Sequence, residues 1–313
     1  MTFQKKVSLV IPCFNEEETI LPFLEETNAC IENLPYEFEF IFVNDGSRDK
    51  TSDILIKAHL EDPRIHIIEF ARNFGKESAL AAGLNAASGD AVIPIDADLQ
   101  HPPQLIVDFV KKWEEGYDVV IGVREQRQAD SFLKRATAGL FYRFFNFLCG
   151  RQLPPNVTDF RLMDRSAVDA LNSLPERVRF TKGLYAWIGF KQAHVLYECP
   201  PRVAGTTKFN GWKLWNFALD GITSFSTLPL RIWSYIGTSI ALIGFLYAIY
   251  LVFKTLIRGI DVPGYTSLMV ALLVIGGLIL ISLGIIGEYL GRIFEETKKR
   301  PLYVIRHRIG FDR

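Results

Sequence analysis

Two long stretches without a charged residue constrain the fold of this chain more than any other feature. They run from Ile232 to Phe253 and from Val262 to Gly287 in a chain of 313 residues. Each is long enough to cross a bilayer as a helix, which takes about 20 residues. The alternative, two helices buried in a large soluble core, is disfavoured because uncharged apolar runs of this length are rare there. The sequence therefore predicts a transmembrane hairpin, with helices at about 232–256 and 265–288.

Basic residues on both sides of the hairpin predict its orientation. Lys208, Lys213 and Arg231 precede the first span, and the segment after the second span is also rich in lysine and arginine. By the positive-inside rule, both ends of the hairpin and both chain termini face the cytoplasm. Small residues, as in GGLILISLGIIG, let membrane helices pack closely, so a homo-oligomer stays open as an alternative to a monomer.

Composition excludes several classes of protein. The 35 basic and 35 acidic residues balance, so no nucleic-acid partner is expected. The four cysteines lack the spacing of metal ligands, which indicates reduced thiols in a cytosol-facing protein.

The first 124 residues alternate strand-like and helix-like patterns. Apolar runs typical of strands lie at 7–12, 38–46, 66–71, 90–96 and 117–124, and helical patterns lie at 15–27, 47–60, 75–87 and 103–113. This alternation predicts an α/β fold, in which a mainly parallel sheet carries helices on both faces. Asn15 is the expected N-cap of the first helix, and Ser47 or Asp49 that of the second.

Polar residues gather where the predicted strands end. They are Asn15, Glu16, Asp45, Arg72, Asp96, Asp98 and Arg124. Ligands of such sheets bind at the carboxyl ends of the strands. Neither GxGxxG after the first strand nor GxxxxGK[ST] is present, so a dinucleotide site and a P-loop have no support. The fold still favours a nucleotide-like ligand at this edge.

The stretch PIDADLQHP places two aspartates two residues apart at the end of an apolar run. If the strand geometry continues, Asp96 and Asp98 point the same way. Two like charges side by side are unfavourable unless a cation joins them, and no lysine or arginine lies nearby in the sequence. Mg²⁺ or Mn²⁺ bridged to a diphosphate would supply that cation. The alternative is a solvated strand end with an aspartate capping the next helix.

Two further motifs leave two interpretations open. In VNDGSRDKT, Asp45 either forms a turn and a helix cap or contacts the base or ribose of a ligand. In RNFGKESA, Arg72 and Lys76 flank a glycine at a helix start, where unpaired N–H groups favour anions. An ordinary helix cap is the alternative there.

Two segments have the pattern of helices that lie in a membrane interface. Residues 131–148 place Leu133, Leu140, Phe144 and other apolar residues on one face, with basic residues off it. A core-facing helix is the alternative. GWKLWNFAL is a second candidate because tryptophan prefers the interface. The predicted organisation is a cytoplasmic domain at 1–205, an interfacial linker at 206–230, the hairpin within 231–290 and a basic cytoplasmic tail at 291–313.

These motifs together resemble a known family. VSLVIPCFNEEETI, VNDGSRDKT, ARNFGKESALAAGL, IPIDADLQHP and TDFRLMDR are similar to segments of the family 2 glycosyltransferases, and more narrowly of the polyisoprenyl-phosphate sugar transferases. The resemblance covers nearly the whole chain. The segment from TKFNGWKLWNF through GEYLGRIFEETKKRPLY looks like the bactoprenol glucosyltransferase type. The Gln-x-x-Arg-Trp motif of the processive synthases is not found.

The resemblance implies a GT-A fold and a role for each matching residue. Pro12, Phe14, Glu16, Asp45, Lys76 and Asp96 would bind the donor nucleotide sugar. Asp98 and Gln100, beside Asp96, would hold Mg²⁺ or Mn²⁺ with the diphosphate. Asp159 matches the position usually given to the catalytic base, and Asp98 is the second catalytic residue. The acceptor phosphate would be met by four basic residues, each of which could instead be a surface side chain: Arg124, Arg135, Arg202 and Lys208.

The implied activity is inverting transfer of a hexose, glucose from UDP-glucose, onto undecaprenyl phosphate at a bacterial inner membrane. The β-linked product would serve glycan modification outside the cytoplasm. A lipid monophosphate has a second pKa near 6, so its oxygen is already largely anionic, and Asp159 either acts as a base or positions the substrates. The alternatives are another donor, such as GDP-mannose, UDP-N-acetylglucosamine or a UDP-aminoarabinose derivative, and a catalytically silent sugar-nucleotide binder.

Overall fold

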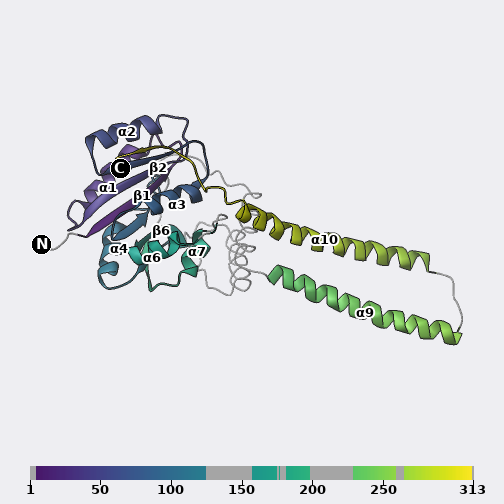
Figure 1. The fold of residues 1–313 in the computed structure, drawn as a ribbon. Coiled ribbons are helices and arrows are strands. Elements are labelled where there is room, and N and C mark those ends of the chain that lie inside the picture. The colour runs from purple at the N-terminus through teal and green to yellow at the C-terminus, as the bar shows by residue number, and fades with distance from the viewer. Residues whose placement is uncertain are drawn as a thin grey trace. The chain divides into compact units, whose positions relative to one another are not determined.

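A computed structural model describes residues 5–124, 157–174, 176, 181–197, 228–258 and 264–311. The chain divides into two units, one made of Met1–Leu214 with Arg300–Arg313 and the other of Trp215–Lys299 (Figure 1). The predicted interfacial helix at 131–148 and nearly all of the linker at 206–230 lie outside the described residues.

A single sheet organises the first unit. Within the described residues it has eight strands in the order β7-β5-β6-β4-β1-β2-β3-β8. β6 runs antiparallel to β4 and β5, β8 runs antiparallel to β3, and the other neighbours are parallel. The predicted mainly parallel sheet is therefore confirmed. The strands are β1 (Lys6–Cys13), β2 (Glu37–Asn44), β3 (Ile65–Phe70), β4 (Ala91–Pro94), β5 (Val119–Arg124), β6 (Val157–Asp164), β7 (Gln192–Tyr197) and β8 (Ile305–Ile309).

Helices cover both faces of this sheet. Successive side chains of a strand point to opposite faces, so an apolar strand such as β1 needs a helix on each side. Leu9 of β1 belongs to one hydrophobic cluster with Phe23 of α1 and Phe109 of α4. Val10 lies on the other face against α3, where a Cβ on Gly83 would be 2.2 Å from the Val10 Cγ1. Gly83 thus lets α3 approach β1 closely. Among the described residues, the helices of this unit are α1 (Ile20–Ile31), α2 (Thr51–Glu61), α3 (Lys76–Ala86), α4 (Leu105–Glu114), α6 (Arg165–Asn172) and α7 (Thr181–Trp187).

The predicted N-cap of the first helix is wrong. α1 begins at Ile20 with Thr19 as its N-cap, not at Asn15. The reason is Pro22, which is tolerated in the first turn but would remove a hydrogen bond from the interior of a longer helix. Asn15 instead adopts a left-handed φ of 55°. Its backbone N–H donates to the Ser47 Oγ at 2.9 Å, and its Oδ1 accepts the Arg48 N–H at 2.9 Å.

The cap predicted for the second helix also differs. Lys50 is the N-cap of α2 and makes no side-chain cap hydrogen bond. Asp49, one residue earlier, accepts the N–H of Thr51 at 3.1 Å. The Ser47 Oγ accepts the Asn15 N–H instead, so the loop after β1 and the loop after β2 are hydrogen-bonded to each other.

A buried carboxylate ties the amino-terminal ends of the strands together. Glu39 of β2 accepts the Ser88 N–H at 2.8 Å and the Ser8 hydroxyl, and it forms an ion pair with Lys6 at 2.6 Å. Burial raises the pKa of Glu39, but these hydrogen bonds and the Lys6 charge outweigh burial and leave the pKa below its ordinary value.

Replacing Glu39 with glutamine is expected to destabilise the fold by about 1–3 kcal/mol at neutral pH. Because its pKa is depressed in the folded state, ionised Glu39 stabilises the fold at pH values above its unfolded-state pKa, near 4.5. This stabilisation disappears as the pH falls through the folded-state pKa. The stability difference between wild type and Glu39→Gln should therefore begin to narrow as the pH falls below about 4.5 and continue to narrow through the lower folded-state pKa. Thermal unfolding in detergent at several pH values measures it, with Glu37→Gln on the exposed start of β2 as the control. A difference that stays constant with pH would contradict the assignment.

The second unit contains two long helices, α9 (Leu228–Arg258) and α10 (Tyr265–Thr297). Both extend beyond the predicted spans. By length and composition alone, Val274–Thr297 of α10 could cross a membrane, with a mean hydropathy of 1.9 and none of it buried. Ile232–Tyr247 of α9 is a shorter apolar stretch.

The segment after the hairpin is not only a basic tail. Residues Ile305–Ile309 form β8, which pairs with β3 in the register Ile67 to Ile309 and Phe70 to Ile305. An uncovered edge strand exposes unpaired N–H and C=O groups. β8 supplies hydrogen-bond partners for these groups along the outer edge of β3. The chain therefore leaves the first unit before the hairpin and rejoins its sheet after it.

Candidate functional site

The order of the strands reverses at β1, which has β2 on one side and β4 on the other. In open α/β sheets, ligands bind outside the carboxyl ends of the strands at such a reversal. The residues that follow β1, β2, β3 and β4 meet at this edge. They supply most of the polar side chains that the sequence singled out.

Asp45 holds the loop after β3. Its Oδ1 accepts the Phe74 N–H at 2.6 Å and its Oδ2 accepts the Gly75 N–H at 2.9 Å. The side chain is buried, and this burial raises its pKa against the opposing effect of the two N–H groups. Gly46 adopts a φ of 68°, and a Cβ there would lie 2.6 Å from the Arg72 carbonyl carbon. The turn and the loop are thus fitted to each other, and Asp45 is not the cap of α2.

The Asp-Ala-Asp stretch presents one polar side. Ile95, Ala97 and Leu99 are buried, whereas the alternate residues Asp96, Asp98 and Gln100 are partly exposed. Leu99 has a left-handed φ of 56°, which ends the extended geometry. The Asp98 Oδ1 accepts the Gln100 N–H at 3.1 Å, which fixes the carboxylate over this turn.

Lys76, the first residue of α3, lies between two of the carboxylates. Its Nζ is 2.7 Å from Asp96 and 3.4 Å from Asp159. Burial lowers the pKa of Lys76, but the charges of Asp96 and Asp159 outweigh this effect and raise the pKa above its ordinary value. The absence of a nearby basic residue in the sequence was therefore misleading, because the fold brings Lys76 to Asp96 from 20 residues earlier.

The site includes residues that sequence reasoning missed. His101 is buried, stacks on Phe160 at 5.1 Å and has its Nδ1 3.9 Å from Asp96. Burial lowers the pKa of His101. Arg161 is also buried, with its guanidinium 3.6 Å from the centre of the Tyr185 ring of α7. His101 directly follows Gln100, a signal that was available, whereas nothing in the sequence links Arg161 with Tyr185.

The remaining candidates are placed as follows. Pro12, Phe14 and Glu16 are partly exposed at the end of β1, and the Glu16 N–H donates to the Thr51 Oγ1 at 2.9 Å. Arg124 is the last residue of β5 and is partly exposed. Three predicted acceptor-phosphate residues lie outside the described residues: Arg135, Arg202 and Lys208.

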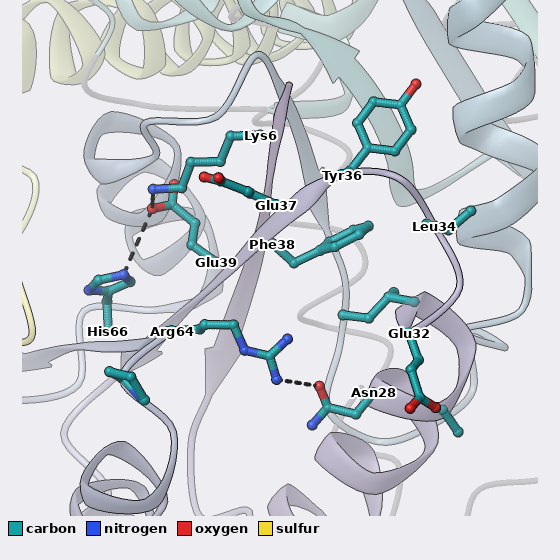
Figure 2. Close-up of a pocket in the computed structure, with 13 residues that line it drawn as sticks. Lys6, Asn28, Glu32, Leu34, Tyr36, Glu37, Phe38, Glu39, Arg64 and His66 are labelled. Atoms are coloured by element: carbon teal, nitrogen blue, oxygen red, sulfur yellow. Dashed lines mark hydrogen bonds and ion pairs between the residues drawn. The ribbon is translucent and has the colours of Figure 1, made fainter. Parts of the chain in front are cut away.

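A hollow of about 760 Å³ lies at the opposite edge of the sheet, beside the starts of β1, β2 and β3 (Figure 2). Its cations already have partners: Arg64 pairs with Asp62 at 2.6 Å and donates to Asn28, and Lys6 pairs with Glu39. Figure 2 shows Arg64 turned toward Asn28, and Lys6 turned toward Glu39. We therefore place the functional site at the carboxyl ends of the strands, despite the size of this hollow.

Comparison with known families decides the class of the protein. The sequence pattern of glycosyl transferase family 2 matches residues 8–171, slightly more than half of the chain. The chain belongs to glycosyltransferase family 2. A second pattern, the GtrB C-terminal hairpin, matches residues 228–293 of this glycosyltransferase and covers α9 and most of α10.

The glycosyltransferase has relatives that match along nearly its whole length. It is 52% identical to an uncharacterised glycosyltransferase of Synechocystis sp. over 98% of this chain and 96% of the relative. It is 50% identical to the bactoprenol glucosyl transferase of Shigella phage SfV, over 96% and 98% of the two chains. A glucosyl-3-phosphoglycerate synthase from Mycobacterium tuberculosis, solved with Mn²⁺, uridine diphosphate and phosphoglyceric acid, has the same fold. Its TM-score is 0.51 at 21% identity, over 70% of this chain and 76% of that one.

Proposed function

We propose that this glycosyltransferase transfers glucose from UDP-glucose to undecaprenyl phosphate with inversion at the anomeric carbon. The similarity to bactoprenol glucosyl transferases carries this proposal, because it spans both the catalytic domain and the hairpin at 50% identity. The clustered carboxylates at the sheet edge support it with the chemistry that such a transfer needs.

The donor would bind at the carboxyl ends of β1 and β4, where the strand order reverses. Pro12, Phe14, Glu16 and Asp45 are assigned to the nucleotide, with Lys76 and Asp96 toward the diphosphate and sugar. Asp96 and Asp98 offer two carboxylates, and Gln100 adds an amide oxygen. In the described part of the chain, no group of three or more His, Cys, Asp or Glu side chains could hold a metal alone. This donor set fits Mg²⁺ or Mn²⁺ shared with a substrate diphosphate.

A divalent cation held by Asp98, Gln100 and Asp96 would neutralise the charge that develops on the departing nucleotide. The side chains of the protein have separate tasks. Lys76 holds Asp96 and Asp159 close together, since its ammonium lies between the two carboxylates. His101, which stacks on Phe160, lies beside Asp96.

The acceptor phosphate is proposed to meet Arg124, Arg135, Arg202 and Lys208, because an anion approaching these carboxylates needs cationic partners. Its oxygen attacks the anomeric carbon as the bond from that carbon to the UDP oxygen breaks. This oxygen is largely deprotonated at neutral pH, so little general-base catalysis is needed. Asp159 then orients the acceptor or the sugar hydroxyls beside Lys76.

The membrane arrangement is proposed on the same grounds. We assign α9 and α10 to a hairpin in a bacterial inner membrane, with the catalytic domain and both termini in the cytoplasm. The pairing of β8 with β3 supports placing both termini on the same side of the membrane, because a chain that rejoins the same sheet must cross the membrane an even number of times. The other boundaries, 1–205 for the catalytic domain and 206–230 for an interfacial linker, are proposals of the same kind.

A donor panel tests the proposed reaction. The purified full-length protein in detergent is given undecaprenyl phosphate, Mg²⁺ or Mn²⁺ and one sugar-labelled donor at a time: UDP-glucose, GDP-mannose, UDP-N-acetylglucosamine or a UDP-aminoarabinose derivative. We expect lipid-extractable label from UDP-glucose to exceed that from any other donor at least about tenfold, because a site built to hydrogen-bond the hydroxyls of one sugar rejects donors that leave those groups unpaired. Omission of undecaprenyl phosphate is the control and should abolish the label.

The other outcomes separate the alternatives. Label mainly from a different donor would keep the reaction class and replace the sugar. No label from any donor, with UDP-glucose still bound in a calorimetric titration, would identify a catalytically silent binder.

A further inference from the structure

The segment that follows the hairpin reaches the loop that Asp45 holds. Tyr303 stacks on Phe70, the last residue of β3, with ring centroids 5.0 Å apart and an interplanar angle of 11°. Phe70 in turn meets the Phe74 ring edge-on at 5.7 Å and 89°. The Phe70 ring therefore links the rings of Tyr303 and Phe74. The backbone N–H of Phe74 donates to Asp45.

A backbone hydrogen bond fixes the same loop at its start. The N–H of Ala71, the first residue after β3, donates to the Val304 carbonyl at 2.9 Å. Residues 71–75 thus have β8 and its preceding segment on one side and the turn at Asp45 and Gly46 on the other. A loop that is held from two sides keeps its N–H groups in place only while both sides are present.

We propose that Tyr303 is a positioning residue for the donor nucleotide pocket, acting through Phe70 and Phe74 on the backbone that binds Asp45. This inference rests on the proposed function, which assigns Asp45 to the nucleotide. The alternative is that the pairing of β8 with β3 only protects the edge of the sheet. The ring contacts favour positioning, because Phe70 is 1% exposed and carries the contact from Tyr303 directly to the loop.

The chain offers a matched control on the same strand. Phe311, after the other end of β8, packs against the His66 ring with centroids 5.0 Å apart and an interplanar angle of 38°. The Phe311→Ala substitution also removes one aromatic contact between the β8 segment and β3, but at the end of β8 that is remote from residues 71–75. A purely structural role of β8 predicts equal effects of Tyr303→Ala and Phe311→Ala on the loop.

Hydrogen exchange of the unliganded full-length protein in detergent tests the positioning. We expect Tyr303→Ala to speed exchange of the Phe74 and Gly75 amides roughly three- to tenfold, the range that follows from losing one aromatic pair. Tyr303→Phe should retain wild-type exchange, and Phe311→Ala should leave these two amides unchanged. Equal acceleration by Tyr303→Ala and Phe311→Ala, or none by Tyr303→Ala, would overturn the proposal.

A UDP titration with Mn²⁺ links this effect to the pocket. The dissociation constant should rise by the same factor in Tyr303→Ala and stay at the wild-type value in Phe311→Ala. Faster exchange with unchanged UDP affinity would overturn the link to the pocket. Failure of the wild type to bind UDP would instead contradict the proposed donor, and the exchange experiment would still report on the loop.

Discussion

Replacing Asp98 with asparagine is expected to reduce glucose transfer by at least about 100-fold, the effect typical of losing one preorganised electrostatic contact to developing charge. The Asp98 Oδ1 accepts the Gln100 N–H at 3.1 Å, and an asparagine oxygen can accept the same bond. The turn should therefore keep its shape while the negative charge is lost. The readout is the initial rate of label transfer to undecaprenyl phosphate in detergent.

A matched variant tests whether the loss of a carboxylate charge matters only at the position of Asp98. Asp108→Asn removes an equal charge from the exposed face of α4, where the Asp108 carboxylate is 54% exposed and pairs with Lys111 at 3.6 Å. It should transfer glucose at the wild-type rate, since surface ion pairs contribute little. Raising the Mn²⁺ concentration should restore part of the Asp98→Asn activity. Retention of more than half of the wild-type rate by Asp98→Asn would remove Asp98 from the proposed donor site.

Replacing Asp159 with asparagine should lower kcat by about 100-fold or more while leaving the dissociation constant of UDP nearly unchanged. General acid–base or positioning groups in direct contact with reactants typically contribute factors of this size. Asp159 lies 3.4 Å from the Lys76 ammonium, so the substitution also removes one of the two carboxylates that surround this charge. Steady-state kinetics with both substrates varied, together with UDP calorimetry, distinguishes a loss of turnover from a loss of binding.

The contact between Asp159 and Lys76 can be tested as a pair. Lys76→Met is expected to impair transfer as well, and the double variant should lose less than the product of the two single losses, because the residues act through one contact. Asp169→Asn, on a carboxylate of α6 that is 64% exposed, provides the control for charge removal. Full additivity of the two losses would show that the ion pair has no catalytic role.

Most of the sheet could be predicted because its signal is local. β1 to β5 and α1 to α4 follow apolar runs and helical patterns, and their observed bounds lie within a few residues of those predicted, apart from the starts of α1 and α2. The error at α1 came from weighing a capping pattern at Asn15 above the cost of Pro22 within a helix. Local signals competed there, and the proline decided the outcome.

The later elements could not be predicted in the same way. β6 contains VTDFRLMD, in which the buried Arg161 interrupts any apolar alternation. The guanidinium of Arg161 lies over the Tyr185 ring of α7. β8 is short and has exposed polar residues, and its partner β3 lies far earlier in the chain. A separation of 20 residues in the sequence was enough to conceal the ion pair of Lys76 with Asp96. Contacts of this kind depend on the completed fold rather than on neighbouring residues.

The return of the chain to β3 also sets an order of events during synthesis. A ribosome delivers β1 to β7 first, then α9 and α10, and only afterwards β8. The sheet therefore gains its last edge after both apolar helices have left the ribosome. A newly made chain that has not yet delivered its hairpin lacks the strand beside β3 and the ring that stacks on Phe70. Maturation of the donor site would in this way be delayed until the membrane segment has been made.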